Sequence, residues 1–380
     1  MEAEITSRAI AFIKQNAKAG KPFFAGCLSP MLVPRPAKVD EYESPQRIQK
    51  LAGYRKRWCV IRCRPRSVGL AVAIVAGSGL AARADQGGLS FWLPGQYGSF
   101  AAVAPAPGFS MPLVFYNYGG TVSRGVALPV GHLLSAGLSG SFDGLFIVPT
   151  YTPDTTVLGA RPNFSLAFAP AYSDSSATVG LGPFSASRSD SLFGGSDLYP
   201  TAQLYWNVGM HNFMTYLAGD IPVGSYNPNR LSNIGIGHGA IDIGGAYTYL
   251  NEKTGTEVSA TLGFTRNFEN HSTDYTNGTD AHLDLGAAQF LNEHFFVGVV
   301  GYYYQQLTAD RGQLAILGPN ESRTRGVGPQ IGYNFNVGGV SIYTNVRGYT
   351  EFESYRRVQG HSIYFTVNLP LSALLRGHSQ

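Results

Sequence analysis

The chain has no run of about 20 apolar residues, the length that a helix needs to cross a bilayer, so a helical membrane protein is excluded. Charged side chains are scarce: they make up 14% of the residues, against about 25% in ordinary soluble domains. Cysteine is nearly absent, since Cys27, Cys59 and Cys63 are the only three and residues 64–380 have none. A disulfide framework in most of the chain is therefore also excluded.

Glycine and aromatic residues are abundant instead. Glycine occurs 47 times, and Tyr and Phe occur 22 times each. Aromatic side chains fit the pleated surface of a sheet, and glycine serves turns and bends. The composition therefore favours strands over helices, which leaves a soluble all-β protein or a membrane β-barrel.

The charge of the chain changes sign after Ala84. Residues 1–84 carry fifteen Lys and Arg against five Asp and Glu, a net charge of +10. Residues 85–380 carry thirteen against nineteen, a net charge of −6, and Lys253 is their only lysine. A nucleic-acid-binding face needs clustered Lys and Arg, so we expect no nucleic acid as a partner of this part of the chain.

Residues 62–84 have the three-part layout of a secretory signal. A basic start is followed by an apolar run over residues 68–82, and the stretch ends in Ala-Arg-Ala at residue 84. We expect a signal peptide that is cleaved before Asp85, with residues 1–61 an N-terminal extension outside the mature protein. The alternative is a buried helix of a soluble domain.

After residue 84, polar and apolar residues alternate in segments separated by Gly, Asn, Asp and Pro, and this period of two is typical of strands with two different faces. Bacterial outer-membrane barrels have an even number of strands, so one of the thirteen segments found is expected to be misread. We predict about twelve strands, within a range of 10 to 14. The segments lie near residues 110–118, 137–150, 162–172, 176–187, 199–208, 211–220, 238–250, 256–267, 280–291, 295–306, 325–336, 340–352 and 361–369.

The lengths of the segments and of their connections favour the membrane. Several segments have the roughly 9 to 11 residues that a tilted strand needs to cross a bilayer. Short polar joins such as residues 292–294 contrast with long polar stretches such as 267–279, as periplasmic turns contrast with outer loops. Aromatic residues near strand ends, among them Tyr302, Tyr303 and Tyr304, are expected to form a belt at the membrane interface.

The sequence predicts an all-β protein, an antiparallel transmembrane β-barrel over residues 110–370. Residues 85–109 precede the first strand and have no strand of barrel length. They are expected to form a plug or a periplasmic segment, with Trp92, Tyr97 and Phe100 as the plug residues. Residues 371–380 form a C-terminal tail.

Four motifs carry a resemblance to a known family. They are GLSFWLPGQYGSF at residues 88–100, NGTDAHLD at 277–284, Ser322-Arg323 with GVGPQ at 326–330, and FTVNLPL at 365–371. On these motifs, residues 85–370 resemble the family called putative MetA-pathway of phenol degradation. The resemblance implies an outer-membrane β-barrel linked to the passage of aromatic or other hydrophobic compounds.

Motifs for enzyme chemistry are lacking. The sequence has no H-E-x-x-H, no G-x-S-x-G and no phosphate-binding loop, and its eight histidines show no metal-ligand spacing on one strand face. We therefore expect no enzyme activity, no cofactor and no metal. A hydrolase on the barrel wall would need Ser, His and Asp or Asn converging in space, and this alternative stays open.

The charged residues of the strands are expected to point into the barrel, because an Arg that faces lipid at mid-depth costs about 2–4 kcal/mol. Two sets on polar faces, Arg347 with Glu351 and His282 with Asp284, are expected to act as ion-paired braces or as a polar lining or gate. The predicted lumen-lining residues are Asp242, His282, Asp284, Tyr343, Asn345, Arg347, Tyr349 and Glu351.

The function that these features predict is passive uptake of small hydrophobic or aromatic compounds through an outer-membrane channel. Its partners would be the lipid bilayer of the bacterial outer membrane and the solutes themselves. A structural barrel without conduction is the other alternative, and the oligomeric state is open.

Overall fold

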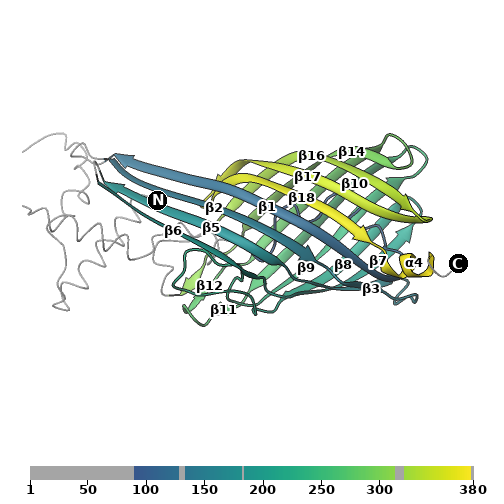
Figure 1. Cartoon of the computed structure of the whole chain (residues 1–380), viewed down its shortest axis with the longest axis horizontal. Coiled ribbons are helices and arrows are strands. Elements are labelled where there is room, and N and C mark those ends of the chain that lie inside the picture. Colours follow the sequence, from purple (N-terminus) through teal and green to yellow (C-terminus); the bar gives the residue numbers. More distant parts are fainter. Residues whose placement is uncertain (1–89, 128–132, 182–183, 313–320, 378–380) are drawn as a thin grey trace, which may run out of the picture. The chain divides into compact units, whose positions relative to one another are not determined.

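The computed structural model describes residues 90–127, 133–181, 184–312 and 321–377, which form a β-barrel and one short helix (Figure 1). The predicted N-terminal extension, residues 1–61, and the predicted signal peptide, residues 62–84, lie outside the described residues. Within the part that is described, no helix is long and apolar enough to cross a membrane.

The elements follow one another along the chain as strands, with a helix at the end. They are β1 (Gly108–Ala127), β2 (Leu133–Ile147), β3 (Thr150–Thr152), β4 (Arg161–Ala167), β5 (Pro170–Leu181), β6 (Phe184–Gly195), β7 (Tyr199–Val208), β8 (His211–Asp220), β9 (Ala240–Asn251), β10 (Thr256–Asn267), β11 (Glu269–Asn270), β12 (Tyr275–Thr276), β13 (Asp280–Phe290), β14 (Phe295–Gln306), β15 (Arg311–Gly312), β16 (Arg323–Val337), β17 (Val340–Tyr355), β18 (Gln359–Leu369) and α4 (Leu371–Gly377).

The barrel is closed by pairing of its first and last strands. β18 lies antiparallel to β1, from Met111 opposite Leu369 to Thr121 opposite Gln359. Three strands of the wall are each divided into two elements by a short break. These strands are β2 with β3, β4 with β5, and β6 with β7, and each is counted as one. The result is a closed antiparallel barrel of twelve strands, which confirms the predicted fold and strand number. A separate small sheet joins β11, β12 and β15.

The one misread segment lies among the interrupted strands. Three segments were predicted at 162–172, 176–187 and 199–208, where the wall has two strands, β4 with β5 and β6 with β7. The segment 176–187 spans the end of β5 and the start of β6. Serine is frequent in both elements, on both faces of β5 and on one face of β6, so the apolar alternation that marks the other strands is weak here.

The wall has an apolar outer face and a polar inner face. In β10, Val258, Leu262 and Phe264 are 47%, 50% and 45% exposed, whereas the alternating Glu257 and Thr265 are buried. This is the reverse of a soluble barrel, whose core would be apolar. A band of exposed Val, Leu, Ile and Phe around a polar interior is the arrangement of a barrel surrounded by lipid.

The two ends of the barrel differ in their connections. At one end, which we call the turn end, strands are joined by short turns at residues 209–210, 252–255, 291–294 and 338–339. Gly338 and Gly339 have φ of +58° and +79°, as a two-residue hairpin turn requires. At the opposite loop end several connections are longer, for example residues 221–239, although β17 and β18 are joined there by residues 356–358 alone. In outer-membrane barrels short turns face the periplasm, so the turn end is the periplasmic one.

Four strands continue past the barrel at the loop end. β1, β2, β5 and β6 run beyond the level of β11 and β12 (Figure 1). The pairing of β18 with β1 ends at Thr121, so the last residues of β1 lie beyond the closed wall.

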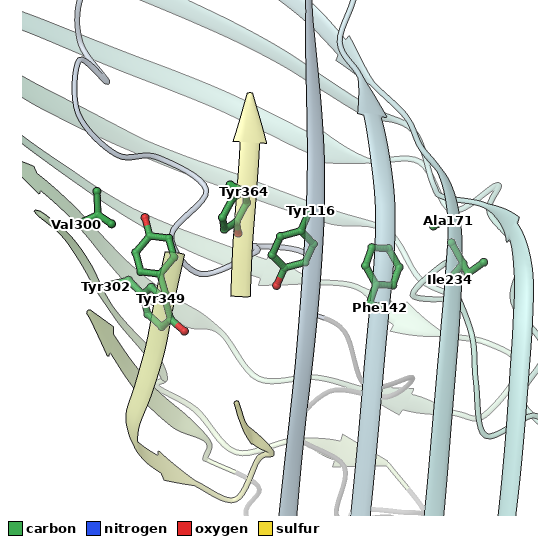
Figure 2. Close-up of a cluster of buried hydrophobic side chains, with 8 residues drawn as sticks. All are labelled: Tyr116, Phe142, Ala171, Ile234, Val300, Tyr302, Tyr349 and Tyr364. Atoms are coloured by element: carbon green, nitrogen blue, oxygen red, sulfur yellow. The ribbon is translucent and has the colours of Figure 1, made fainter. Parts of the chain in front are cut away.

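A group of tyrosines fills part of the interior. Tyr302 and Tyr304 are 5% and 0% exposed, so their prediction as members of an outer aromatic belt is wrong. Figure 2 shows Tyr302 beside Tyr349, with Tyr364 and Tyr116 next to them. Alternate residues of a strand point to opposite faces, so Tyr302 and Tyr304 share one face and Tyr303, between them, points to the other.

Candidate functional site

Residues 90–107, which we call the inner segment, lie inside the barrel and lead into β1. The segment contains no strand, and Trp92 and Ala102 are 2% and 0% exposed. It contacts side chains from β4, β7 and β8 and from most strands between β9 and β18. Contacts on so many wall strands mean that the segment crosses the lumen.

Wall side chains accept hydrogen bonds from the main chain of the inner segment. The Asp284 carboxylate of β13 accepts from the N–H groups of Gly95 and Tyr97, each at 3.0 Å. Glu257 of β10 accepts from the Phe100 N–H at 2.8 Å, and Thr248 Oγ1 of β9 accepts from the Ala102 N–H at 3.0 Å. A strand partner would supply main-chain carbonyls, and here side chains of the wall take their place.

Other wall side chains donate to the carbonyls of the same stretch. Tyr364 Oη donates to the Pro94 carbonyl at 3.0 Å, and Tyr349 Oη to the Gly95 carbonyl at 3.1 Å. Arg347 Nη2 donates to the Gln96 carbonyl at 3.2 Å, and its guanidinium lies 5.0 Å from the centre of the Tyr364 ring. The wall therefore pairs with both N–H and C=O groups of the segment's main chain.

The fit between wall and segment leaves little space. A Cβ on Gly286 of β13 would lie 2.5 Å from the Ser99 nitrogen, and one on Gly98 would lie 2.7 Å from Arg347 Nη1. Gly95 has φ +80°, a conformation that side chains with a Cβ rarely adopt. Glycine is thus required on both sides of the contact.

An aromatic stack holds the start of the segment. The Trp92 ring lies 3.5 Å from the His282 ring, nearly parallel at 15°, and also stacks on Tyr97 and Tyr216. His282 Nε2 is 3.0 Å from Asp242 Oδ2, and both side chains are buried. Two of the predicted residues thus form a pair behind the tryptophan.

Another buried carboxylate, that of Glu351 on β17, binds only wall residues. It accepts hydrogen bonds from Tyr118 Oη at 3.0 Å, Tyr302 Oη at 2.9 Å and the Gly360 N–H at 2.7 Å. These partners lie on β1, β14 and β18. Glu351 therefore joins wall strands next to the closure between β1 and β18.

The sequence candidates lie on the inner face, but their partners differ from those expected. Asp242, His282, Asp284, Asn345, Tyr349 and Glu351 are buried, and Tyr343 and Arg347 are partly buried. An ion-paired brace was one of the two roles expected for Arg347 with Glu351 and for His282 with Asp284. In the structure Arg347 binds the Gln96 carbonyl, and His282 pairs with Asp242. Asn345 donates to the Ile331 carbonyl of the neighbouring strand at 3.2 Å.

Several contacts with the inner segment were not expected from the sequence. Glu257 and Thr248 are polar strand residues like many others, and Gln330 Nε2 donates to Ser99 Oγ at 2.6 Å. Gln203 of β7 donates to Tyr97 Oη at 2.9 Å. The sequence could indicate only that these residues occupy inward-facing positions of their strands. Their partners lie more than a hundred residues away along the chain, so no local pattern connects them.

A cavity of about 790 Å³ lies between the inner segment and the turn end. Its walls combine aromatic and aliphatic side chains with polar turn residues. The lining residues are Ser99, Phe100, Val103, Ala104, Pro105, Leu250, Glu252, Lys253, Thr254, Gly255, Phe290, Leu291, Asn292, Glu293, Asn334, Tyr343 and Asn368.

The described residues offer no assembled catalytic or metal site. No group of three His, Cys, Asp or Glu that could hold a metal occurs among them. His282 and Asp242 form a buried pair, but its near neighbours are Tyr216 and Trp92. Within the described ranges no hydrogen bond joins a serine hydroxyl to a histidine, as a hydrolytic triad requires.

Comparison with known structures gives outer-membrane barrels. The structure of the COG4313 outer membrane channel from Pseudomonas putida F1 is 12% identical, with a TM-score of 0.51, and the match covers 71% of this chain and 98% of that one. A FadL homologue from Pseudomonas aeruginosa is 8% identical, with a TM-score of 0.36, over 69% of this chain and 90% of that one. The first match supports the fold.

No curated protein matches the chain. The family model described as "Putative MetA-pathway of phenol degradation" matches residues 97–367, which include the end of the inner segment and nearly all of the barrel. The motifs at residues 88–100 and 277–284 meet in the structure, because Gly95 and Tyr97 bind Asp284. The chain belongs to this family of outer-membrane barrels.

Proposed function

We propose that the protein is an outer-membrane channel for passive uptake of small hydrophobic or aromatic compounds, in which the inner segment is the gate. The observation that carries this proposal is how the segment is held. It crosses the lumen on hydrogen bonds to wall side chains, without pairing as a strand. Such a segment can leave or shift while every strand pair of the barrel stays formed.

The size of the barrel supports the same function. About eight strands already enclose an interior that side chains can fill, so a twelve-stranded barrel has more lumen than its own wall residues need. The inner segment occupies part of this room, and the cavity of about 790 Å³ lies next to it. The P. putida neighbour is itself described as an outer membrane channel.

Deletion of residues 90–100 tests the gate. We expect the variant to insert as a folded barrel and to raise the permeability of liposomes to small polar solutes, measured by swelling, because the lumen loses its filling. Growth on aromatic compounds should weaken, since selectivity is lost. Heat-modifiable migration on gels is the control for folding. Unchanged permeability in a folded barrel would favour a structural barrel without conduction.

We also propose that the mature protein begins at Asp85 in the outer membrane of a bacterium. The signal layout of residues 62–84 supports this, together with the lipid-facing band of the wall. Mass spectrometry of the protein from the outer-membrane fraction should give Asp85 as the first residue. A mature N-terminus well before residue 62 would contradict the cleavage site and leave the barrel unaffected.

A further inference from the structure

The apolar outer face of β16 ends in two arginines. Its outward positions run from Val337 at the turn end to Val327, both exposed, and Arg325 and Arg323 take the next two outward positions. The ten residue steps between the two valines correspond to about 33 Å along the strand, or about 25 Å across the membrane at a tilt of about 40°. This is the height of the apolar band of an outer-membrane barrel, so both arginines lie at the level of the lipid head groups of the outer leaflet.

A bulge in β17 places a carboxylate beside these arginines. The pairing of β17 with β16 shifts by one residue at Phe352, which lies between Glu351 and Glu353. Glu351 is buried in the barrel, and regular alternation would turn Glu353 inward as well. The extra residue turns it outward instead, where its Oε1 lies 2.9 Å from Arg323 Nε and its Oε2 lies 3.1 Å from Arg325 Nη1. The carboxylate thus holds two guanidinium groups side by side on the outer face.

Tyrosine rings orient the same guanidinium groups and a third one. Arg325 lies 5.0 Å from the centre of the Tyr303 ring, on the neighbouring strand β14. Arg323 and Arg356 lie 5.7 and 5.0 Å from the centre of the Tyr355 ring. Arg356 follows β17 directly and has φ +56°, in the left-handed region that residues with a Cβ rarely adopt. Cation–π contacts restrict long arginine side chains, so three cations are held near one another before any ligand arrives.

Arg323, Arg325 and Arg356, which we call the arginine cluster, carry more positive charge than their surroundings neutralise. The first two share the single carboxylate of Glu353, and among the described residues Arg356 forms no ion pair. Two positive charges are left in excess, and Glu321, two residues before β16, would offset only one of them. The predicted mature chain has a net charge of −6, so this local surplus stands out on the outer face. It is complementary to an anionic lipid surface.

We propose that the arginine cluster is a docking site for the phosphate groups of lipid A, the doubly phosphorylated glycolipid of the bacterial outer leaflet. Guanidinium groups bind phosphate oxygens through two parallel hydrogen bonds, and the cluster lies at the level of these phosphates. The acyl chains lie along the apolar outer face, where Val327 and Phe352 are exposed. The fixed cations reduce the repulsion between phosphates next to the wall. The site is on the outer surface, so it goes beyond the channel proposal and is independent of conduction.

Native mass spectrometry of the full-length protein in detergent micelles tests the ligand class. Lipid A with two phosphates, lipid A with one phosphate and phosphatidylglycerol are the three lipids to compare. We expect the first to bind about tenfold more tightly than the second, which has the same acyl chains, and phosphatidylglycerol to bind more weakly still. Pyrophosphate at the same concentration should not displace lipid A, because it lacks acyl chains. If either of the other lipids binds equally well, or if pyrophosphate displaces lipid A, the assignment is wrong.

Two variants and one matched control locate the site. Arg325→Gln and Arg356→Gln should each weaken the binding of doubly phosphorylated lipid A about fivefold, and the double variant about twentyfold, because each removes one charge contact. Arg266→Gln is the control, since it removes the same charge from the exposed loop end of β10 and should leave binding unchanged. Binding that is unchanged in both cluster variants, or that falls equally in the control, would refute the site. Heat-modifiable migration confirms that each variant is folded.

Thermal stability gives an independent readout of the same site. Doubly phosphorylated lipid A should raise the unfolding temperature of the unchanged barrel and of Arg266→Gln, because a ligand that binds only the folded state stabilises it. The rise should be much smaller for the double variant of Arg325→Gln with Arg356→Gln. An equal rise in all three proteins would mean that lipid A binds elsewhere on the wall and that the arginine cluster is not its docking site.

Discussion

The two sides of the barrel wall differ in how many hydrogen bonds they form with the inner segment. The continuous strands β9 to β18 provide most of its anchors, through Thr248, Glu257, Asp284, Gln330, Arg347, Tyr349 and Tyr364. The interrupted strands provide Gln203 and Arg161, which bind Tyr97 and the Pro105 carbonyl. An unbroken strand keeps one parity facing inward along its whole length, so its polar residues line up along the segment.

The interrupted side is tied to a loop instead. Residues 221–239 lie along β6, where Asp190 accepts from Arg230, from the Leu231 N–H and from the Ser232 N–H. Asp197, in the break between β6 and β7, accepts from Gly224 and Ile236. Carboxylates therefore organise both sides, holding the segment on one and a loop on the other. Substitutions at each side should have separable effects.

The largest effect is expected from Asp284→Ala. Two N–H groups of the inner segment lose their acceptor, which should cost about 3 kcal/mol of seating free energy, or about a hundredfold in the seated population. We expect higher single-channel conductance in planar bilayers. A cysteine placed at Tyr97 should also react faster with a soluble thiol reagent.

The control for this change is Glu351→Gln, a buried carboxylate whose partners are wall residues. We expect it to lower the unfolding temperature of the barrel while the conductance stays near that of the unchanged protein. Conductance that rises equally in both variants would mean that any loosened carboxylate opens the lumen, and that Asp284 has no special part.

The second effect is expected from Gly286→Ala, which acts by volume. Its Cβ would lie within 3 Å of the main chain at Gly98 and Ser99, so the segment must move by an ångström or so, at a cost of about 1–3 kcal/mol. Conductance should rise less than for Asp284→Ala. Gly219→Ala is the matched control, since the added Cβ meets only ordinary contacts at 3.7 and 3.8 Å. Equal conductance of the two variants would argue against close packing at residue 286.

The sequence allowed the fold to be predicted because alternation is local. Polar positions such as Asn345 and Arg347 share a parity, and residues between them face lipid whatever the rest of the chain does. The partners within the barrel were not predictable in this way. Asp284 binds Gly95 and Tyr97, 187 or more residues earlier, and no spacing rule connects them. The serine-rich β5 and β6 were misplaced because the apolar alternation is weak in both.

A smaller effect is expected on the interrupted side from Arg230→Ala. Arg230 forms a two-point contact with Asp190, at 2.7 and 3.1 Å, and also donates to the Ser191 carbonyl. Because the pair is partly exposed, its loss should cost about 1 kcal/mol or less. We expect faster protease cleavage within residues 221–239 at unchanged conductance. A rise in conductance would show that this loop, too, contributes to closing the lumen.

The smallest effect concerns the pH dependence of the same loop through His238. This side chain is buried, with Nδ1 3.0 Å from the Gly239 carbonyl oxygen and Nε2 3.2 Å from the Asn277 amide. Burial lowers the pKa of His238 below its ordinary value, although the nearby Asp197 acts in the opposite direction.

His238 therefore binds a proton more readily when the loop of residues 221–239 has opened than when the loop is packed and the side chain is buried. The contribution of His238 to packing is complete above the ordinary histidine pKa of about 6.5 and is lost as the pH drops below it. The equilibrium constant for packing of the loop falls by a factor of at most about ten per pH unit. Amide hydrogen exchange of residues 221–239 should therefore speed up between pH 7.5 and pH 5, after correction for the intrinsic rate. His238→Gln keeps a neutral hydrogen-bonding side chain and should remove this dependence. If the variant shows the same acceleration, the acid sensitivity arises from another group, and the loop is held independently of His238.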